Sequence, residues 1–577
     1  MSEGRVSLNE AEAGGPDEDP GGPTCPPDPV RSPCSDEPDR QGLSAVSFFS
    51  ADLSPSPSAE PIGLLSLPWE ILTHIVSHLP AQCVISVLPK VCHTLCTVSK
   101  DSTAWQLRAQ RLIGSRASFP VGPRENFDWP TACLEMEQLI SRWTKEMQHK
   151  AKQSQEDEED RNLEQGRGAN VGGQEDAADE VGGVGVVAQE VAYGADVGME
   201  SVREDVEMQP VLDGDQMARL RIELEDQLED GALMEDGQVA LNADVGQKAA
   251  LRDHNAFMNQ DNGEQAEGME HQAPRGPSTP PALECITLPS SHNALVNSVL
   301  LLGGEGALCA TASRDWDVKL WDLQAGSNGM LLYTLGRQGD FSTHRGWVWC
   351  LASEGPLLAS GGFDSTVRLW DLQAGGADRG LIRTGAAVLC LSCQTDVLLA
   401  GTFDKRISMY DTRAAEPLIK SLNCHGNAVM CLTADDKYII SGSKDRTVAV
   451  YDRRAGKGLK KIHMSSYLLS MSHSGHEVWT GDNRGMLHCF SMQAGTLKHL
   501  SQFNVGHTAV VTGIHRSQGS LYSCSTDRTV KVHVPSAPPR TLYTLHHQDS
   551  VHGLSAKAGV LAVASGGVSV EIYRPRK

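Results

Sequence analysis

Aromatic side chains are scarce in this sequence, and no apolar run approaches the roughly 20 residues that a membrane-spanning helix needs. Phe, Trp and Tyr make up 5% of the 577 residues. Residues 1–19 are rich in glycine and acidic side chains and lack the apolar segment of a secretion signal. We therefore expect no membrane partner and an intracellular location, in the cytoplasm with the nucleus as an alternative.

Blocks of basic residues are also absent, although the chain as a whole is acidic, with a formal net charge of −23. Residues 151–275 contain 31 acidic and nine basic residues, whereas residues 283–577 carry a net charge of +6. The acidity therefore belongs to one segment. Because no basic block or stripe is present, neither DNA nor RNA is expected as a partner.

The cysteines form no framework of paired positions, since there are 15 of them, scattered along the chain. Cys390 and Cys393 make a CxxC within an apolar, strand-like stretch. One such pair supplies only two of the four ligands of a structural zinc site. We expect buried, reduced thiols, and neither a metal nor another cofactor.

Two segments lack the apolar periodicity of a folded domain. Residues 1–60 are rich in Pro, Ser, Gly and Asp, and residues 151–280 are acidic and of low complexity. Such compositions bury too little apolar surface to offset the entropy of the chain, so both segments are predicted to be disordered. The acidic segment is interpreted as a charged tether, with an acidic docking segment as the alternative.

Residues 64–113 have a different character, because their apolar residues recur at helical spacings of three and four. The stretch is too short for a large core, so an apolar face is expected to remain for a partner. Such a pattern also fits small helical domains of several kinds, and this general interpretation stays open. The stretch resembles the F-box, a three-helix module, in Leu67-Pro68-x-Glu70-Ile71-Leu72, Leu79-Pro80, Val91-Cys92-His93 and Trp105.

In that module an apolar face binds a Skp-type adaptor. The resemblance assigns this role to Leu67, Pro68, Ile71, Leu72, Ile75, Leu79, Val91 and Cys92. For Leu72 and Ile75, a place in the core of the module is an equally good interpretation. Residues 127–150 follow with an apolar stripe at helical spacing, which predicts a connector helix that braces the F-box.

From residue 283 onward the chain repeats itself. Strand-like apolar segments end, 39 to 49 residues apart, at Trp321, Trp370, Tyr410, Tyr451, Phe490, His533 and Tyr573. An Asp stands six residues before five of these ends, and in five units a His stands four residues before a Val. The Asp positions and the His positions thus recur independently at the same interval. This agreement indicates a repeat architecture built of short strands.

These repeats resemble the WD-repeat β-propeller, in which four-stranded sheets pack around a central channel. Seven ends imply seven blades over residues 283–577, and Leu283–Leu288 is expected to complete the last blade. The third unit lacks the His and the fifth lacks both His and Asp, so looser loops are expected there. The second unit has the full polar set of that family, to which the resemblance gives a structural and not a catalytic role: His344, Ser360, Asp364 and Trp370.

The chain is therefore predicted to be multidomain, with a small all-α F-box and connector helix, a long disordered acidic insert and an all-β seven-bladed propeller. This order resembles the F-box/WD-repeat family of substrate receptors in cullin-RING ubiquitin ligases. It implies a non-catalytic subunit of an SCF-type ligase. Its F-box would join a Skp-type adaptor, a cullin scaffold and a RING subunit, and its propeller would hold an unidentified protein target.

Two other functions remain open at this point. One is a scaffold that uses its F-box outside a ubiquitin ligase. The other is an enzyme, although no nucleophile–base–oxyanion pattern and no phosphate-binding glycine loop occurs outside the repeat positions.

In propellers of this family the target binds where the His-bearing loops and Asp-bearing turns meet around the channel. On this sequence the resemblance assigns that face to Arg314, Phe363, Phe403, Lys444 and Thr526, and to Arg345, Trp347, Ala387, Tyr467 and Val510. Aromatic and Arg side chains are enriched in binding hot spots, whereas a phosphate-reading pocket needs several converging Arg. Recognition through aromatic or mixed contacts is therefore favoured. Phe363 and Phe403 have an alternative role as caps on the strands beneath.

Overall fold

The computed structural model describes residues 63–168, 282–289, 291–337, 342–493 and 495–576, with the backbone alone described from 156 to 168. Residues 1–60 and most of 151–280, both expected to be disordered, lie outside the described residues. Within the described residues, no helix is both long enough and apolar enough to cross a membrane.

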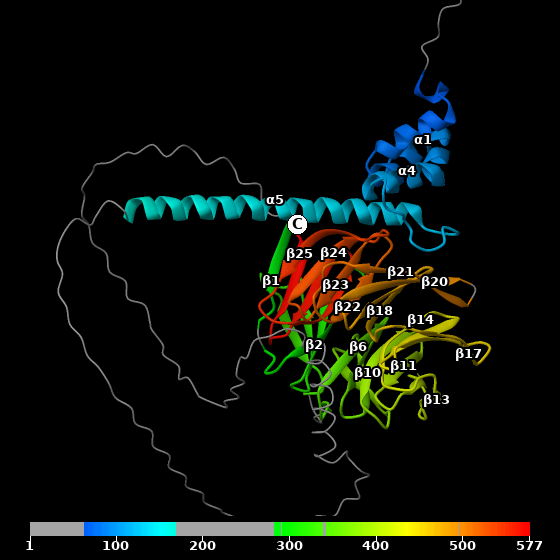
Figure 1. The fold of residues 1–577 in the computed structure, drawn as a ribbon. Coiled ribbons are helices and arrows are strands. Elements are labelled where there is room, and N and C mark those ends of the chain that lie inside the picture. Colours follow the sequence, from blue (N-terminus) through cyan, green and yellow to red (C-terminus); the bar gives the residue numbers. More distant parts are fainter. Residues whose placement is uncertain (1–62, 169–281, 290, 338–341, 494, 577) are drawn as a thin grey trace, which may run out of the picture. The chain divides into compact units, whose positions relative to one another are not determined.

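The N-terminal part of the described chain is helical (Figure 1). Pro68 and Pro80 stand directly before the first two α-helices, and the Asp101 carboxylate accepts a hydrogen bond from the Thr103 amide, 2.9 Å, at the start of the fourth. The elements are η1 (Leu64–Ser66), α1 (Trp69–His78), α2 (Ala81–Ser86), η2 (Leu88–Lys90), α3 (His93–Lys100), α4 (Ser102–Ile113) and α5 (Trp129–Gly168).

The core of this helical module closes on the first part of α5. Trp105 is buried on α4 and donates its indole N–H to the Ser99 carbonyl oxygen, 2.8 Å away. Ala132, Cys133 and Met136 of α5 belong to the same buried cluster. The connector helix predicted for residues 127–150 therefore completes the core of the module. It also runs on to Gly168, so residues 151–168, assigned to the acidic insert from composition, are helical.

The rest of the described chain forms seven four-stranded antiparallel sheets. The seven-bladed propeller expected from the repeats is confirmed. Blades 1 to 4 contain β2 (Val296–Leu302), β3 (Leu308–Ser313), β4 (Val318–Asp322) and β5 (Met330–Thr334); β6 (Val348–Glu354), β7 (Leu357–Gly362), β8 (Thr366–Asp371) and β9 (Ala377–Arg383); β10 (Val388–Gln394), β11 (Val397–Thr402), β12 (Ile407–Asp411) and β13 (Leu418–Leu422); and β14 (Val429–Ala434), β15 (Tyr438–Ser443), β16 (Thr447–Asp452) and β17 (Lys457–His463).

Blades 5 and 6 also follow chain order, and blade 7 takes its outermost strand from the start of the repeat region. They contain β18 (Leu468–Ser474), β19 (Glu477–Asp482), β20 (Met486–Gln493) and β21 (Thr496–Asn504); β22 (Val511–Arg516), β23 (Leu521–Ser525), β24 (Thr529–Val534) and β25 (Arg540–His546); and β26 (Val551–Lys557), β27 (Val560–Ser565), β28 (Val570–Pro575) and β1 (Leu283–Thr287).

Strand β1 closes the ring. It pairs antiparallel with β28, with Ile286 opposite Ile572, so the first and last parts of the repeat region share one sheet. Figure 1 shows the green β1 beside the red strands of the chain end. The prediction that residues 283–288 supply the missing strand is confirmed, and closure leaves blade 7 with a full set of four strands.

Helix α5 also packs on the propeller. The ring centroid of Trp143 lies 5.4 Å from that of Tyr543 and 6.3 Å from that of Tyr573. One Glu135 carboxylate oxygen accepts hydrogen bonds from the Ser517 hydroxyl, 2.6 Å, and the Gly519 amide, 2.7 Å. One helix therefore contributes to the core of the helical module and to the packing of blades 6 and 7.

Candidate functional site

The helical module leaves a cluster of apolar side chains exposed. Ile71 of α1 is 48% exposed and Val91, after η2, is 61% exposed. Other exposed apolar residues of the module are Leu64, Leu65, Trp69, Ile75, Ile85 and Val87. Exposed apolar side chains of this number and size are typical of protein-binding surfaces.

The eight residues assigned to the adaptor divide between surface and core. Pro68, Ile71, Ile75 and Val91 are exposed. Leu67, Leu79 and Cys92 are half-buried and pack against the core cluster. Leu72 is only 3% exposed, so it belongs to the core of the module and offers almost nothing to a partner.

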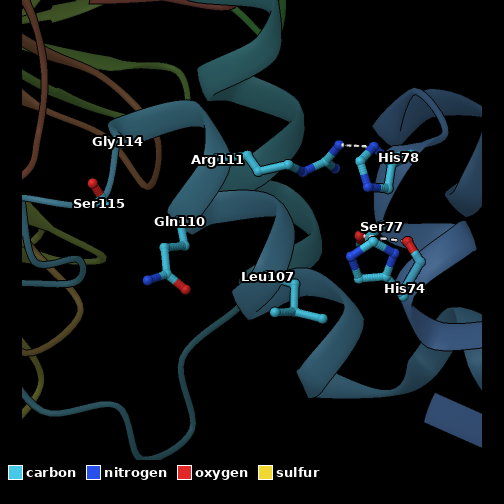
Figure 2. Close-up of a pocket in the computed structure, with 8 residues that line it drawn as sticks. All are labelled: His74, Ser77, His78, Leu107, Gln110, Arg111, Gly114 and Ser115. Atoms are coloured by element: carbon cyan, nitrogen blue, oxygen red, sulfur yellow. Dashed lines mark hydrogen bonds between the residues drawn. The ribbon is translucent and has the colours of Figure 1, made fainter. Parts of the chain in front are cut away.

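A hollow of about 330 Å³ lies between α1 and α4 (Figure 2). Arg111 Nη1 is 2.6 Å from His78 Nδ1, and because a guanidinium only donates, the imidazole nitrogen accepts and His78 is neutral. Partial desolvation and the Arg111 charge lower the pKa of His78 below its usual range. His74 stands beside it, with ring centroids 4.9 Å apart. None of the residues that line this hollow is among the exposed apolar side chains named above.

In the propeller, hydrogen bonds tie the His-bearing loops to the Asp-bearing turns. In blade 2, His344 Nε2 lies 2.8 Å from Ser360 Oγ, which accepts from Trp370 Nε1 at 2.9 Å. His344 Nδ1 lies 3.0 Å from Asp364 Oδ2, and the same oxygen accepts the Arg345 amide at 2.8 Å. Loop and turn are therefore held side by side at one end of the blade.

The same arrangement recurs in blades 1, 4 and 6, where His292, His425 and His507 face Asp315, Asp445 and Asp527. Burial raises the pKa of Asp315, but hydrogen bonds from His292 and two backbone amides outweigh it and bring the pKa to about 2. The carboxylates stay ionised, and their oxygens accept hydrogen bonds that hold the loop and the turn together.

Blade 5 lacks the usual His and Asp but does not have a loose turn. Asp482, two residues before the expected position, is buried and lies 2.6 Å from Ser466 Oγ and 3.0 Å from His488 Nε2. It also accepts the amides of Arg484 and Met486. The expectation of a looser loop in this unit is wrong, because a displaced Asp takes over the role of the missing residues.

Several residues assigned to target binding gather around one aromatic cluster. Buried Phe363 lies between Trp347 and Trp349, with ring centroids 5.6 and 5.2 Å apart, and half-buried Phe403 packs on the same cluster. Arg314 stacks over Trp347, 4.7 Å from its ring centroid. The cluster joins side chains from blades 1, 2 and 3.

The other assigned residues differ in how much surface they offer. Phe363 is 3% exposed, and Ala387 and Val510 are also buried, so the role of these three lies beneath the surface. Half-buried positions are Arg314, Trp347, Phe403, Lys444, Tyr467 and Thr526, and Arg345 is exposed. The half-buried rings of the cluster are Trp347, Trp349 and Phe403, and Arg314 lies over Trp347.

Sequence reasoning missed Trp316, which follows Asp315 in the turn of blade 1. Its side chain is 50% exposed and its φ of +73° lies in the left-handed region, which costs a non-glycine residue about 1 kcal/mol or more. The corresponding positions in blades 2, 3, 4 and 6 are Ser365, Lys405, Arg446 and Arg528. The sequence could have pointed to this residue, because Trp316 is the only aromatic residue at these five equivalent turn positions.

The inner strands of all seven blades line a central channel of about 240 Å³. The described residues contain no group of three His, Cys, Asp or Glu side chains that could hold a metal ion. Every described cysteine is free, including Cys390 and Cys393. Burial raises the pKa of the Cys393 thiol to about 11, so it is protonated at neutral pH.

The chain is similar to known proteins in its repeats and over most of its length. The family model of the WD domain, G-beta repeat, matches residues 283–322, 336–371, 416–452 and 497–533. The WD40 β-propeller domain of Doa1 is 21% identical and covers 50% of this chain and 96% of its own, with a TM-score of 0.44. The WD40 repeats of RRP9 are 15% identical and cover 51% and 97%, with a TM-score of 0.46.

Two relatives match almost the whole chain, and both are named F-box/WD repeat-containing protein 9. The Bos taurus protein is 34% identical over 535 residues, which cover 92% of this chain and 87% of the relative. The Homo sapiens protein is 35% identical over 549 residues, which cover 95% and 87%. With the helical module and the seven-bladed propeller in place, this similarity shows that the chain belongs to the F-box/WD repeat-containing proteins.

Proposed function

We propose that this chain is the substrate-recognition subunit of an SCF-type ubiquitin ligase. Its F-box binds a Skp-type adaptor, through which the cullin scaffold and RING subunit join, and its propeller holds the protein target. The observation that carries the proposal is the set of exposed apolar side chains of the F-box, Ile71 and Val91 among them, in a member of this family.

The receptor performs no bond chemistry in this proposal. It raises the local concentration of the target near the ubiquitin-charged enzyme, so the gain comes from tethering. The target meets the propeller at the aromatic cluster that contains Trp347 and Phe403, with Arg314 over Trp347, and exposed Arg345 is assigned to the same face. Large aromatic surface beside guanidinium groups is the composition of a binding hot spot.

The adaptor interface is tested with a double variant of exposed residues, Ile71→Ala with Val91→Ala. Truncating interface anchors removes about 2 kcal/mol or more, so adaptor affinity is expected to fall at least about thirtyfold. The matched control is Leu418→Ala with Ile419→Ala, two exposed apolar residues of propeller strand β13. Affinity is measured with purified full-length chain and adaptor.

Unchanged adaptor affinity in the folded Ile71/Val91 variant would contradict the interface. Co-purification from cells separates the ligase from a scaffold, since a ligase subunit brings the cullin with the adaptor. Adaptor without cullin would favour the scaffold.

A further inference from the structure

The outer strands of blades 3 and 4 enclose a groove of about 500 Å³ that lies away from the aromatic cluster. Four lysines line it: Lys420 on β13, and Lys457, Lys460 and Lys461 on β17. No Asp or Glu is among the described residues that line it. The groove is therefore strongly cationic.

Little of this charge is neutralised by neighbouring side chains. Lys420 Nζ donates to neutral oxygens, the Tyr451 hydroxyl at 2.7 Å and the Gly456 carbonyl at 3.4 Å. Lys461 Nζ lies 3.3 Å from a carboxylate oxygen of Asp445. Across the described chain, no carboxylate pairs with Lys457 or Lys460, and both are exposed.

The surrounding sequence is basic as well. Residues 424–463, which form most of blade 4, contain eight basic and four acidic residues, whereas the whole of 283–577 has a net charge of only +6. Leu459 of β17 also lines the groove and is exposed, so an apolar contact lies among the lysines. A ligand that fits is an acidic peptide with aliphatic side chains.

The chain itself contains such a peptide. Residues 169–281 include 25 acidic and six basic residues, and within them residues 222–236 read Ile-Glu-Leu-Glu-Asp-Gln-Leu-Glu-Asp-Gly-Ala-Leu-Met-Glu-Asp. Acidic and aliphatic residues alternate there. At about 3.3 Å per residue, the 46 residues between Asp236 and Leu283 span up to ~150 Å, so length does not prevent this stretch from reaching any blade.

We propose that the groove between β13 and β17 is an acidic-peptide docking site and that residues 222–236 of the same chain occupy it. Covalent attachment gives this occupant an effective concentration that a free peptide of equal charge must overcome. Contact between exposed lysines and carboxylates weakens with ionic strength, because the Debye length falls from about 10 Å at 0.1 M to about 3 Å at 1 M salt.

The first test uses the full-length chain and a zero-length carbodiimide cross-linker, which joins a lysine amine to a carboxylate in direct contact. We expect cross-links from Lys457 and Lys460 to acidic residues of 222–236, and their loss at 1 M salt. Lys498, an exposed lysine on strand β21, is the matched control. Equal cross-linking of Lys498 to this segment would overturn the proposal.

The second test measures binding of a labelled synthetic peptide of residues 220–236. The partner proteins are the full-length chain and a full-length variant with Glu223→Gln, Glu225→Gln, Asp226→Asn, Glu229→Gln and Asp230→Asn. Because the neutralised segment no longer competes, the peptide should bind the variant at least about tenfold more tightly. Adding Lys457→Glu and Lys460→Glu should abolish this binding, and adding Lys498→Glu should not.

Each other outcome contradicts a defined part of the proposal. Equal affinity for both proteins would mean that the groove is open and serves an acidic partner in trans. No binding to either protein would mean that the groove is not an acidic-peptide site. Both readouts are independent of adaptor and target binding, so they stand apart from the ligase proposal.

Discussion

At the level of single residues, Arg108 of α4 connects three helices of the F-box. Its Nη1 donates to a Glu137 carboxylate oxygen of α5 at 2.6 Å, and its Nη2 donates to the Val76 carbonyl of α1 at 2.8 Å. The other Glu137 oxygen accepts the Ala81 amide of α2 at 2.7 Å. A charged pair thus organises the centre of a small helical core.

Replacing one member of this pair is expected to be costly. Glu137→Ala leaves a buried guanidinium without its counter-charge, and broken buried pairs of this kind lose about 3–5 kcal/mol of folding free energy. Chemical denaturation of the full-length chain, followed by an F-box probe such as Trp105 fluorescence, measures the loss. Arg108→Met with Glu137→Met should recover most of it, and a Glu137→Ala variant as stable as the native protein would contradict the role of the pair.

The aromatic cluster gives a residue-scale prediction about target binding. Trp347→Ala with Phe403→Ala removes two half-buried rings of the cluster, whereas Arg314→Ala with Arg345→Ala removes two guanidinium groups. Because the ring area is larger and Arg314 is stacked on Trp347, the aromatic pair should weaken target capture more strongly. Capture is measured by proximity labelling in cells under proteasome inhibition. If neither pair lowers capture in folded, adaptor-bound protein, the target site is elsewhere.

At the level of elements, α5 has two roles that its sequence stripe does not separate. Residues 132–136 complete the F-box core, and the Trp143 ring packs at a tilt against Tyr543 and Tyr573 of the propeller. One face of a helix usually serves one core. Here the stripe continues from one core to the next, so the sequence predicts a packing helix without showing that it packs on two domains.

Removing the Trp143 ring should release α5 from the propeller without unfolding either domain. Trp143→Ala is expected to cost about 3–5 kcal/mol of packing energy at this contact. Hydrogen exchange should therefore rise in α5 near residues 139–150 and stay unchanged in β14 to β17. Met147→Ala is the control, since Met147 lies one turn further and is exposed. Equal exchange in the two variants would argue against a docked helix.

Periodicity predicted the propeller well, and it failed where a residue moved out of register. Two recurring spacings predicted the seven blades, because blades 1, 2, 4 and 6 repeat the same hydrogen bonds between a His, an Asp and a Ser or Thr. Asp482 in blade 5 performs the usual role two positions early, and a search by register cannot find it. For Leu72 and Phe363 the sequence left both a partner contact and a buried role open, because apolar type alone does not distinguish a core residue from an interface anchor, and both are buried.

At the level of the whole molecule, the acidic insert is not what holds F-box and propeller together. A Glu146 carboxylate oxygen of α5 lies 3.4 Å from the Leu283 amide at the start of β1. The chain therefore leaves α5 and returns to a point in contact with it. Helix α5 itself continues beyond Glu146 to Gly168, so the chain returns to the side of α5 and not to the point at which the helix ends.

Buried imidazoles make the stability of the propeller depend on pH. His533 is fully buried, 2.9 Å from Ser523 Oγ and 3.0 Å from Thr541 Oγ1. Burial, with the nearby charges of His507 and Lys531, lowers its pKa from 6.5 to about 3. Burial also lowers the pKa values of His515 and His552 to about 4. All three are neutral in the folded protein near pH 5, where the unfolded chain protonates them.

The pKa values of these three His residues are lower in the folded protein than in the unfolded chain. Their contribution to the free energy of unfolding is therefore fully present above pH 6.5, and it is lost as the pH falls from 6.5 toward 4. Each such His contributes a slope of about 1.4 kcal/mol per pH unit in this window. Asp315, with a pKa of about 2, adds a loss of stability only below pH 3.8.

Denaturation at pH 7.5, 6.5, 5.5 and 5.0 measures how steeply the free energy of unfolding depends on pH. His533→Gln should be less stable at pH 7.5 but should lose less on acidification, because one proton-accepting site of the unfolded chain is gone. The exposed His463→Gln is the control, and an unchanged slope in the His533 variant would contradict a neutral, buried imidazole at that position.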